Sequence, residues 1–318
     1  MAYRLKLKEP LTKGVRRIAG EQLGNAAARL EGGSNPETSV HEARKSLKRT
    51  RALLRLIRPG LGETDFRKAN ARLRDIARSL SAARDRDVVR GLLKSLEEAK
   101  PSLAKAAGRL RALLDDAPAI ANGSGASQRN VADALHEIDA MRRELGDIAL
   151  HPASFDTIVA GLTKSHRAGR KALARARANP EETEALHDLR KAAQAYWRQM
   201  ILIQQAWPEA CLARAAAAKS VADLLGHDHD VALLDAVLAG PEGQSLTAAE
   251  RRTLARYCAG RHSELRAEAL PKAELLFIEK SDQLGARVRA LWDSAQEALR
   301  VHPRAEARSE AAEDRRSS

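Results

Sequence analysis

The stretch "SVHEARKSLKRTRALLRLIRP", residues 39–59, carries the pattern that organises the rest of the chain. It holds seven arginines and lysines, one histidine, His41, and a single carboxylate, Glu42. Successive residues of an ideal helix are about 100° apart, and this spacing predicts an amphipathic helix here. Its apolar face is formed by Ala43, Leu47, Leu54 and Ile57. The basic residues gather on the opposite face as one continuous stripe.

This first basic stripe contains His41, Arg44, Lys45, Lys48, Arg51 and Arg55. An ordinary surface helix mixes the two signs of charge, because Glu–Lys pairs four residues apart stabilise it. Like charges at that spacing instead cost about 0.2–0.5 kcal/mol per pair. A solvated surface face is one interpretation of the stripe. We favour the other, in which an anionic ligand offsets the repulsion.

A second stretch, "ALHDLRKAAQAYWRQMILIQQAWP" at residues 185–208, resembles a thinner copy of the first. Its apolar face is formed by Leu189, Ala193, Met200 and Ile203. Its basic stripe contains His187, Arg190, Lys191 and Arg198, while Gln194 and Trp197 replace Lys48 and Arg51. We therefore expect the first stripe to dominate any shared site.

A further pair of motifs supports an internal duplication. "RDRDVV" at 84–89 and "HDHDVA" at 227–232 follow the two histidine motifs in the same order. The interval is 46 residues from His41 to Asp87 and 43 residues from His187 to Asp230. Two motifs at nearly equal intervals predict a weak repeat that divides the chain near residue 150.

The aspartates of these motifs admit two interpretations. We expect each motif to begin a helix, with Asp85 or Asp228 capping backbone N–H groups. Asp87 or Asp230 is then expected to pair with an arginine of the basic helix. A metal site is the alternative, since His and Asp are good ligands. Consecutive helical residues point about 100° apart, however, so four in a row cannot face one ion.

The composition predicts an all-α chain of 318 residues with around a dozen helices. Breaks between helices are expected at 31–39, with Pro36 in the loop, and at 58–65, 150–156 and 239–250. Residues 115–130 are predicted to be a flexible linker, and the charged tail at 302–318 to be disordered.

The charge points to a polyanionic partner. The formal net charge is +13 and the sequence pI is near 10.1, whereas aromatic residues make up only 3%. That scarcity weakens any mechanism based on stacking nucleic-acid bases. Cys211 and Cys258 lack metal-ligand spacing and are expected to be free thiols. Since neither a signal peptide nor a spanning segment stands out, we expect a cytoplasmic protein with no membrane contact.

These motifs together resemble the conserved histidine α-helical domain, or CHAD, family. The resemblance is carried by "VHEARKSLKRTRALL", "LSAARDRDVV", "LHDLRK" and "LLGHDHDVA". "HRAGRKALARA" at 166–176 and "LLFIEK" at 275–280 extend it over roughly residues 3–300. Gln194, Trp197, His227 and His229 depart from the family's pattern.

The resemblance implies two helical-bundle subdomains, 1–150 and 151–302, related by pseudo-twofold symmetry within one domain over 1–302. Residues 303–318 follow as the charged tail. A basic channel between the subdomains would bind inorganic polyphosphate, and polyphosphate granules with their other proteins would be the setting. The chain resembles a stand-alone binder. Carried over by position, and extended along the two stripes, the ligand residues are His41, Arg44, Lys45, Lys48, Arg51, Arg55, Arg170, His187, Arg190, Lys191, Arg198 and Lys280.

We expect no catalysis, cofactor or metal, since the sequence shows no phosphate-binding glycine loop and no nucleophile–base pair. The main alternative is a general nucleic-acid or polyanion binder, with nucleic acid expected only as a weak competitor of polyphosphate. A metal-dependent phosphohydrolase of the HD type, suggested by His227 and Asp228, is the second alternative. A granule scaffold that acts through partner proteins is compatible with polyphosphate binding.

Overall fold

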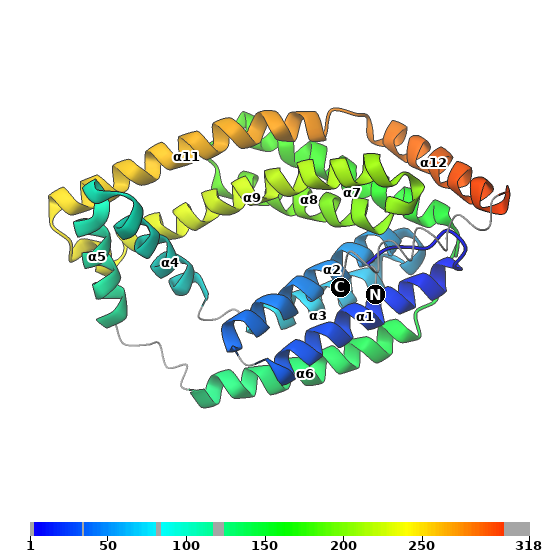
Figure 1. The fold of residues 1–318 in the computed structure, drawn as a ribbon, viewed down its shortest axis with the longest axis horizontal. Coiled ribbons are helices and arrows are strands. Elements are labelled where there is room, and N and C mark those ends of the chain that lie inside the picture. Colours follow the sequence, from blue (N-terminus) through cyan, green and yellow to red (C-terminus); the bar gives the residue numbers. More distant parts are fainter. Residues whose placement is uncertain (1–2, 34, 81–83, 117–123, 302–318) are drawn as a thin grey trace.

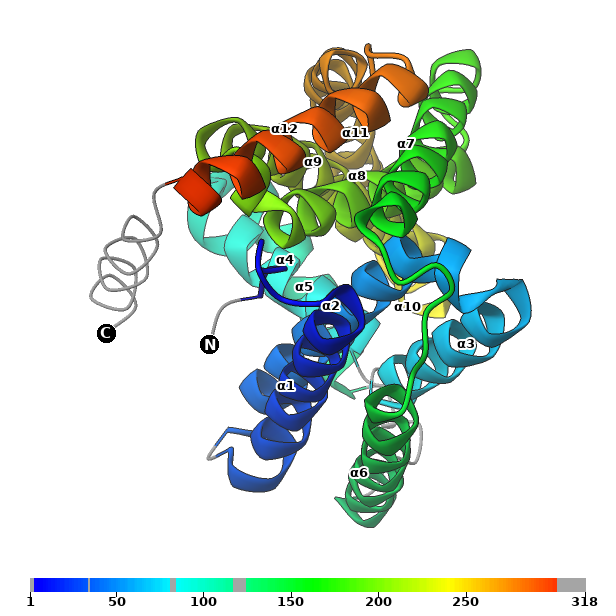
Figure 2. The same cartoon turned by 90° about the vertical axis from the view of Figure 1, so that its right-hand side faces the viewer.

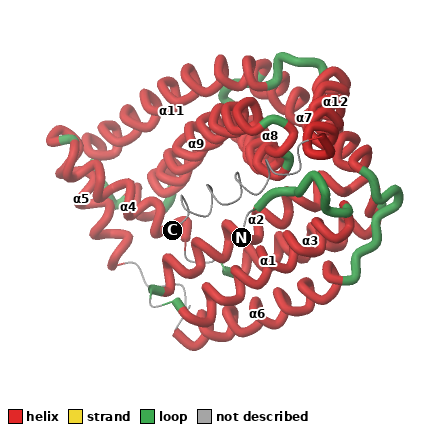
Figure 3. The backbone as a smooth tube through the Cα atoms, turned by 45° about the vertical axis from the view of Figure 1, so that its right-hand side comes forward, coloured by secondary structure: helices red, strands yellow, loops and turns green. Residues whose placement is uncertain are grey.

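The computed structural model describes residues 3–33, 35–80, 84–116 and 124–301, and within these ranges it contains twelve α-helices, one 3₁₀ helix and no strand. Figure 3 shows helices joined by loops over the described chain. The predicted all-α class with about a dozen helices is confirmed. The helices are α1 (Leu11–Gly32), α2 (Pro36–Leu61), α3 (Glu63–Ser79), α4 (Arg84–Ala99), α5 (Pro101–Asp116), α6 (Ser124–Gly146), α7 (Phe155–Ala178), α8 (Thr183–Leu202), η1 (Gln204–Ala206), α9 (Pro208–Ala239), α10 (Pro241–Gln244), α11 (Ala248–Leu276) and α12 (Ser281–Val301).

The helices form two groups that face each other (Figure 1). One group contains α1, α2, α3 and α6, and the other contains α7, α8, α9, α11 and α12. The same grouping appears in the turned view of Figure 2. Helix α2 packs against both α7 and α8, so it joins the groups. Among the described helices, none is long and apolar enough to cross a bilayer.

The N-terminal segment also ties the two groups together. The backbone N–H of Leu5 donates to the carbonyl oxygen of Leu202 over 2.8 Å. The side-chain Nε2 of Gln296, on α12, donates to the carbonyl oxygen of Leu7 over 2.7 Å. The first residues of the chain therefore contact the end of α8 and the last helix.

The predicted breaks agree with the helix boundaries except at three places. Pro36 is the first residue of α2 and not part of a loop, because a first-turn N–H has no helical partner to lose. Pro59 lies inside the last turn of α2, which continues to Leu61. The predicted linker is wrong at its end, since α6 begins at Ser124. Residues 117–123 of that linker and the predicted tail at 302–318 lie outside the described residues.

Two hydrophobic clusters hold the helices. The larger cluster includes buried residues from α2 and α8, such as Leu47, Leu54, Leu189 and Met200. The smaller cluster joins α4 and α5 to α9 and α11, through residues such as Leu93. Apolar side chains therefore pack α4 and α5 against α9 and α11, which lie about a hundred or more residues later in the chain.

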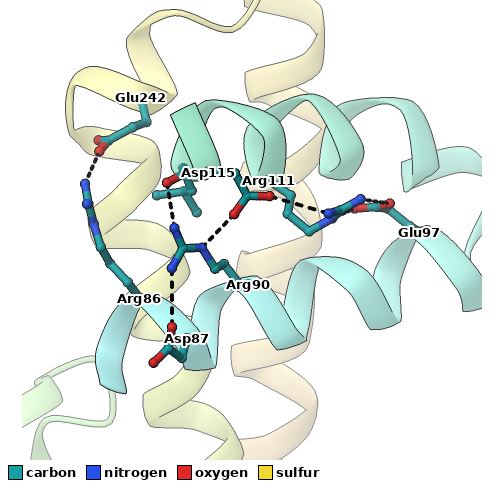
Figure 4. Close-up of polar contacts among 8 residues, drawn as sticks. Arg86, Asp87, Arg90, Glu97, Arg111, Asp115 and Glu242 are labelled. Atoms are coloured by element: carbon teal, nitrogen blue, oxygen red, sulfur yellow. Dashed lines mark hydrogen bonds and ion pairs between the residues drawn. The ribbon is translucent and has the colours of Figure 1, made fainter. Parts of the chain in front are cut away.

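Ion pairs fasten the hairpin of α4 and α5 (Figure 4). Arg90 pairs with Asp115 over 2.8 Å, and Arg86 pairs with Glu242 of α10 over 2.7 Å. Asp87 pairs with Arg90 of its own helix over 3.3 Å. The expectation that Asp87 pairs with an arginine of the basic helix is therefore wrong. Arg90 lies one turn along α4, within reach of the short aspartate side chain.

Helices α2 and α7 approach each other closely at Gly161. A Cβ atom at this position would lie 1.8 Å from the carbonyl oxygen of Leu56, near the C-terminal end of α2. Backbone cannot move aside as a flexible side chain can, so even a methyl group would force the helices apart. By contrast, a Cβ atom at Gly260 on α11 would meet nothing within 4 Å.

We predict that Gly161→Ala lowers the free energy of unfolding by about 3 kcal/mol, at the upper end of the usual cost of overpacking. Gly260→Ala is the matched control, and it should raise stability by up to about 1 kcal/mol, because alanine favours a helix interior. Urea unfolding of the two variants measures both effects. Equal stability of the two variants would contradict the close approach of α2 and α7.

Candidate functional site

The two basic stripes face one cavity of about 630 Å³. Its lining comes from α2, α3, α4, α8 and α9. Eight residues expected as ligands from the sequence line it: Arg44, Lys48, Arg51, Arg55, His187, Arg190, Lys191 and Arg198. The structure therefore brings together residues that are more than 130 positions apart in the chain.

The apolar faces of α2 and α8 orient these charges. Ala43, Leu47 and Ile57 of α2 are fully buried, as are Leu189 and Ala193 of α8. Each helix turns its apolar face toward the shared core, so its opposite face is directed at the cavity. The helical periodicity therefore predicted the placement of both stripes.

Four of the residues expected as ligands do not line this cavity. His41 and Lys280 are exposed. Lys45 pairs with Glu42 of its own helix over 2.7 Å. Arg170 donates through Nη1 to the carbonyl oxygen of Glu279 over 2.6 Å, in the α11–α12 connection.

The structure adds cavity residues that the sequence did not point out. Arg74 and Arg78 come from α3, four residues apart on one face. Asp85 comes from the first turn of α4, and His229 from α9. In the sequence, Arg74 and Arg78 stand out only because they lie four residues apart on the face of the helix opposite Leu73 and Ile76, which are buried. With Arg74 and Arg78 included, the described lining of the cavity contains nine arginines and lysines and one carboxylate.

Several of the cavity's guanidinium groups are held by neutral oxygens. Arg44 Nη1 donates to the carbonyl oxygen of Ala77 over 2.9 Å. Arg51 Nε donates to Oδ1 of Asn70 over 3.0 Å, and Arg198 Nη1 donates to the carbonyl oxygen of Gln194 over 2.8 Å. These contacts orient the groups without neutralising them. Within the described ranges, no ion pair joins Arg51, Arg55 or Arg198 to a carboxylate.

Arginines elsewhere in the fold pair with carboxylates, and so do Arg74 and Arg78 of the cavity, which both contact Asp75. Arg111 binds Glu97 over 2.6 Å, and Arg72 binds Glu137 over 2.9 Å. A second cavity of about 430 Å³ also has many cations, but Arg175 there pairs with Asp188 over 3.1 Å. Among the described residues, the first cavity therefore differs in holding three arginines that no carboxylate pairs, Arg51, Arg55 and Arg198.

Burial and mutual repulsion act on the cavity's arginines. Burial, with help from Arg55 and Arg74, lowers the pKa of Arg51 to about 10. Burial likewise lowers the pKa of Arg198 to about 10, and Arg49 contributes to this shift. Both remain charged at neutral pH. A bound anion would relieve the repulsion and compensate for the lost hydration.

The motif at 227–230 does not begin a helix, contrary to the expectation from the sequence. It lies in the middle of α9, which runs unbroken for 32 residues. Asp228 is buried and accepts hydrogen bonds from His262 Nδ1 over 2.7 Å and from Arg266 Nε over 2.9 Å. Its oxygens therefore bind α11 and do not cap backbone N–H groups.

The geometry of this motif also bears on the metal alternative. Arg266 donates to the same oxygen, Oδ1, that His262 contacts, and a cation at that position disfavours a metal ion. In the described part of the chain, no three His, Cys, Asp or Glu residues form a group that could hold a metal. Asp228 is thus better explained as part of a buried ion pair between α9 and α11.

Comparison with known proteins identifies the fold. A model of the CHAD domain matches residues 17–239. The crystal structure of the CHAD domain from the plant Ricinus communis is similar, with a TM-score of 0.55 and 20% identity. The match covers 87% of this chain and 94% of that chain. A comparison with curated proteins finds no match.

We predict that Asp228→Asn lowers the free energy of unfolding by about 1–3 kcal/mol, because it removes one of the two carboxylates that pair with the buried Arg266, the other being Glu181. Asp223→Asn, at an exposed pair with Lys219 on the same helix, is the control and should change stability by less than about 1 kcal/mol. Thermal unfolding measures both. If Asp228→Asn released a bound divalent ion in elemental analysis, the ion-pair interpretation would be wrong.

Proposed function

This chain belongs to the CHAD domain family, and from that premise we propose that it binds inorganic polyphosphate in the cavity between α2 and α8. One observation carries the proposal. Arg198 is buried, and Arg51 and Arg55 are half-buried in the cavity wall, yet no carboxylate pairs with them within the described chain. Buried charges are normally paired, so a polyanion is the partner that such an arrangement lacks.

The residue types suit phosphate oxygens. A guanidinium group grips two oxygens at once in a fixed plane, while a lysine acts as a point charge. Arginines supply most of the cavity's cations. Polyphosphate carries about one negative charge per phosphate and no bases, so charge density and spacing are what a binder recognises. Two rigid helices that present opposed rows of cations provide both.

The lining favours polyphosphate over nucleic acid. As far as the structure describes the chain, the lining contains no Phe, Tyr or Trp. Proteins that bind single-stranded nucleic acid commonly stack bases on aromatic side chains. Trp197 lies under the guanidinium group of Arg198, 4.5 Å from its ring centroid, so one face of the aromatic ring is already covered.

We propose binding without catalysis. Among the described residues, the cavity lining contains no serine, threonine or cysteine, and Asp85 is its one carboxylate. A nucleophile with an adjacent base, or a pair of carboxylates, is what hydrolysis by the protein's own side chains would need. Residence at polyphosphate granules, with other granule proteins, follows from the proposed ligand.

We also propose that the cavity is part of a channel between two subdomains related by pseudo-twofold symmetry. The subdomains would be residues 1–150 and 151–302, within one domain over 1–302. In support, α2, α3 and α4 line the cavity from the first half, and α8 and α9 from the second. The smaller hydrophobic cluster crosses this division, so the halves share a core.

The first stripe should dominate binding. Lys191 of the second stripe pairs with Asp188 over 3.0 Å, so part of its charge is already offset. Gln194 is neutral. The α2 stripe directs Arg44, Lys48, Arg51 and Arg55 into the cavity.

We predict that Arg44→Glu with Lys48→Glu weakens binding of long-chain polyphosphate about 100-fold or more, because reversed charges would repel the ligand. The matched control is Arg251→Glu with Arg252→Glu, at exposed positions in the first turn of α11. This control variant changes the net charge by the same amount as the α2 variant, but at positions away from the cavity. Calorimetric titration of both double variants measures the dissociation constants, with circular dichroism to check folding.

Near-equal weakening by the two double variants would mean that polyphosphate responds to net charge and not to this cavity. Unchanged binding by the α2 variant would place the site elsewhere.

A further inference from the structure

Two histidine rings from different helices lie side by side in the cavity wall. His187 comes from α8 and His229 from α9, and their ring centroids are 5.5 Å apart. Both rings line the cavity. Nδ1 of His187 is buried and has no hydrogen-bond partner in the described part of the protein. Because both rings line the cavity, a phosphate entering it would lie beside the imidazole pair.

The charges around the pair come from several helices. His187 faces Arg190, Lys191 and Glu184 of its own helix as well as His229 of α9. His229 faces Arg190 of α8, Asp85 of α4, and the neighbouring carboxylates Asp228 and Asp230. Other cations complete the same lining: Arg44 from α2, and Arg74 and Arg78 from α3.

These surroundings keep both imidazoles neutral in the empty cavity. Burial lowers the pKa of His187, and Lys191, His229 and Arg190 lower it further. Burial also lowers the pKa of His229, with Arg190 acting in the same direction and the carboxylates partly opposing it. Since a free histidine titrates near pH 6.5, both rings are mainly uncharged at pH 7.

Resting on the proposed function, we propose that the pair formed by His187 and His229 takes up about one proton when polyphosphate enters the cavity, which makes binding tighter at lower pH. Phosphate charges beside the rings favour the imidazolium form, and a protonated ring can donate through both nitrogens. One proton is expected, and not two, because two imidazolium rings at this separation repel each other.

The direction of the pH effect follows from the two states. The pKa of the pair is higher in the loaded cavity than in the empty one. Affinity therefore rises as pH falls from above the loaded pKa toward the empty pKa, and it is constant below both. Arg51 and Arg198 stay charged across this range, because their lowered pKa values are still about 10. The internal phosphates of the chain are strong acids that stay ionised. Among the described lining residues, the two histidines are the side chains whose ordinary pKa lies near this range.

The test is calorimetric titration of the full chain with long-chain polyphosphate at pH 6.5, in two buffers of different ionisation enthalpy. The difference in apparent heat gives the number of protons taken up. We expect about one proton per filled cavity. We also expect the dissociation constant to fall about 20-fold from pH 8 to pH 6, because an uptake of about one proton at pH 6.5 needs a pKa difference of about two units between the two states.

Two variants locate the source of the protons. His187→Gln with His229→Gln should abolish the uptake and flatten the pH profile. His136→Gln, at an exposed position on α6, is the control and should behave as the unmodified chain does.

The outcomes separate the two proposals. Tight binding without proton uptake, or uptake that persists in the double variant, would overturn the role of the histidine pair and leave polyphosphate binding standing. If polyphosphate bound at neither pH 6 nor pH 8, the proposed function and this inference would both be wrong. Uptake lost in the double variant and kept in His136→Gln would support the inference.

Discussion

The main physical constraint on this fold is that it must hold many positive charges close together in one cavity. Helices α2 and α8 turn rows of arginine and lysine toward the same cavity, where those groups repel one another and lose hydration. The opposite faces of the same helices are apolar and fully buried in the larger hydrophobic cluster. Burial of apolar surface is worth roughly 25 cal/mol per Å², so a large core can offset the repulsion. An anion that enters the cavity removes the repulsion without loss of the core.

The rest of the fold fixes the shape of that cavity. The close approach at Gly161 holds α7 against α2. The hairpin of α4 and α5 packs on α9 and α11, and this brings Asp85 to the cavity wall that also contains His229. Neutral carbonyl and amide oxygens orient Arg44, Arg51 and Arg198. Oxygen acceptors of this kind position a guanidinium group and leave its charge available to a ligand.

Much of this arrangement could be predicted from the sequence, because helical periodicity separates the charged face of a helix from its apolar face. Both stripes and the all-α class were recognisable in this way, and the residues of the second stripe all line the cavity. Helical periodicity also put His41 and Lys45 in the first stripe, and Arg170 and Lys280 were expected from a family pattern, yet none of the four lines the cavity. Motif position does not show which way a side chain points in three dimensions.

Other features depend on contacts between distant helices, which local sequence does not reveal. The aspartates of residues 227–230 resembled a helix start, yet α9 runs through them and Asp228 binds partners from α11. His229 could be recognised as part of a histidine pair only from the structure, in which His187 of α8 lies beside it. Arg74 and Arg78 carried no motif at all, and only the packing of α3 on α2 brings them into the cavity.

We propose that the cavity selects polyphosphate among polyanions. The most direct measurement is the dissociation constant for long-chain polyphosphate at several salt concentrations, with duplex DNA as a competitor at equal charge. If about six phosphates are contacted, the log–log slope of affinity against salt should be near −4, by analogy with single-stranded nucleic acids. We predict this slope together with little displacement of polyphosphate by DNA. Displacement by DNA as readily as by polyphosphate itself would contradict it, and the cavity would then be a general polyanion site.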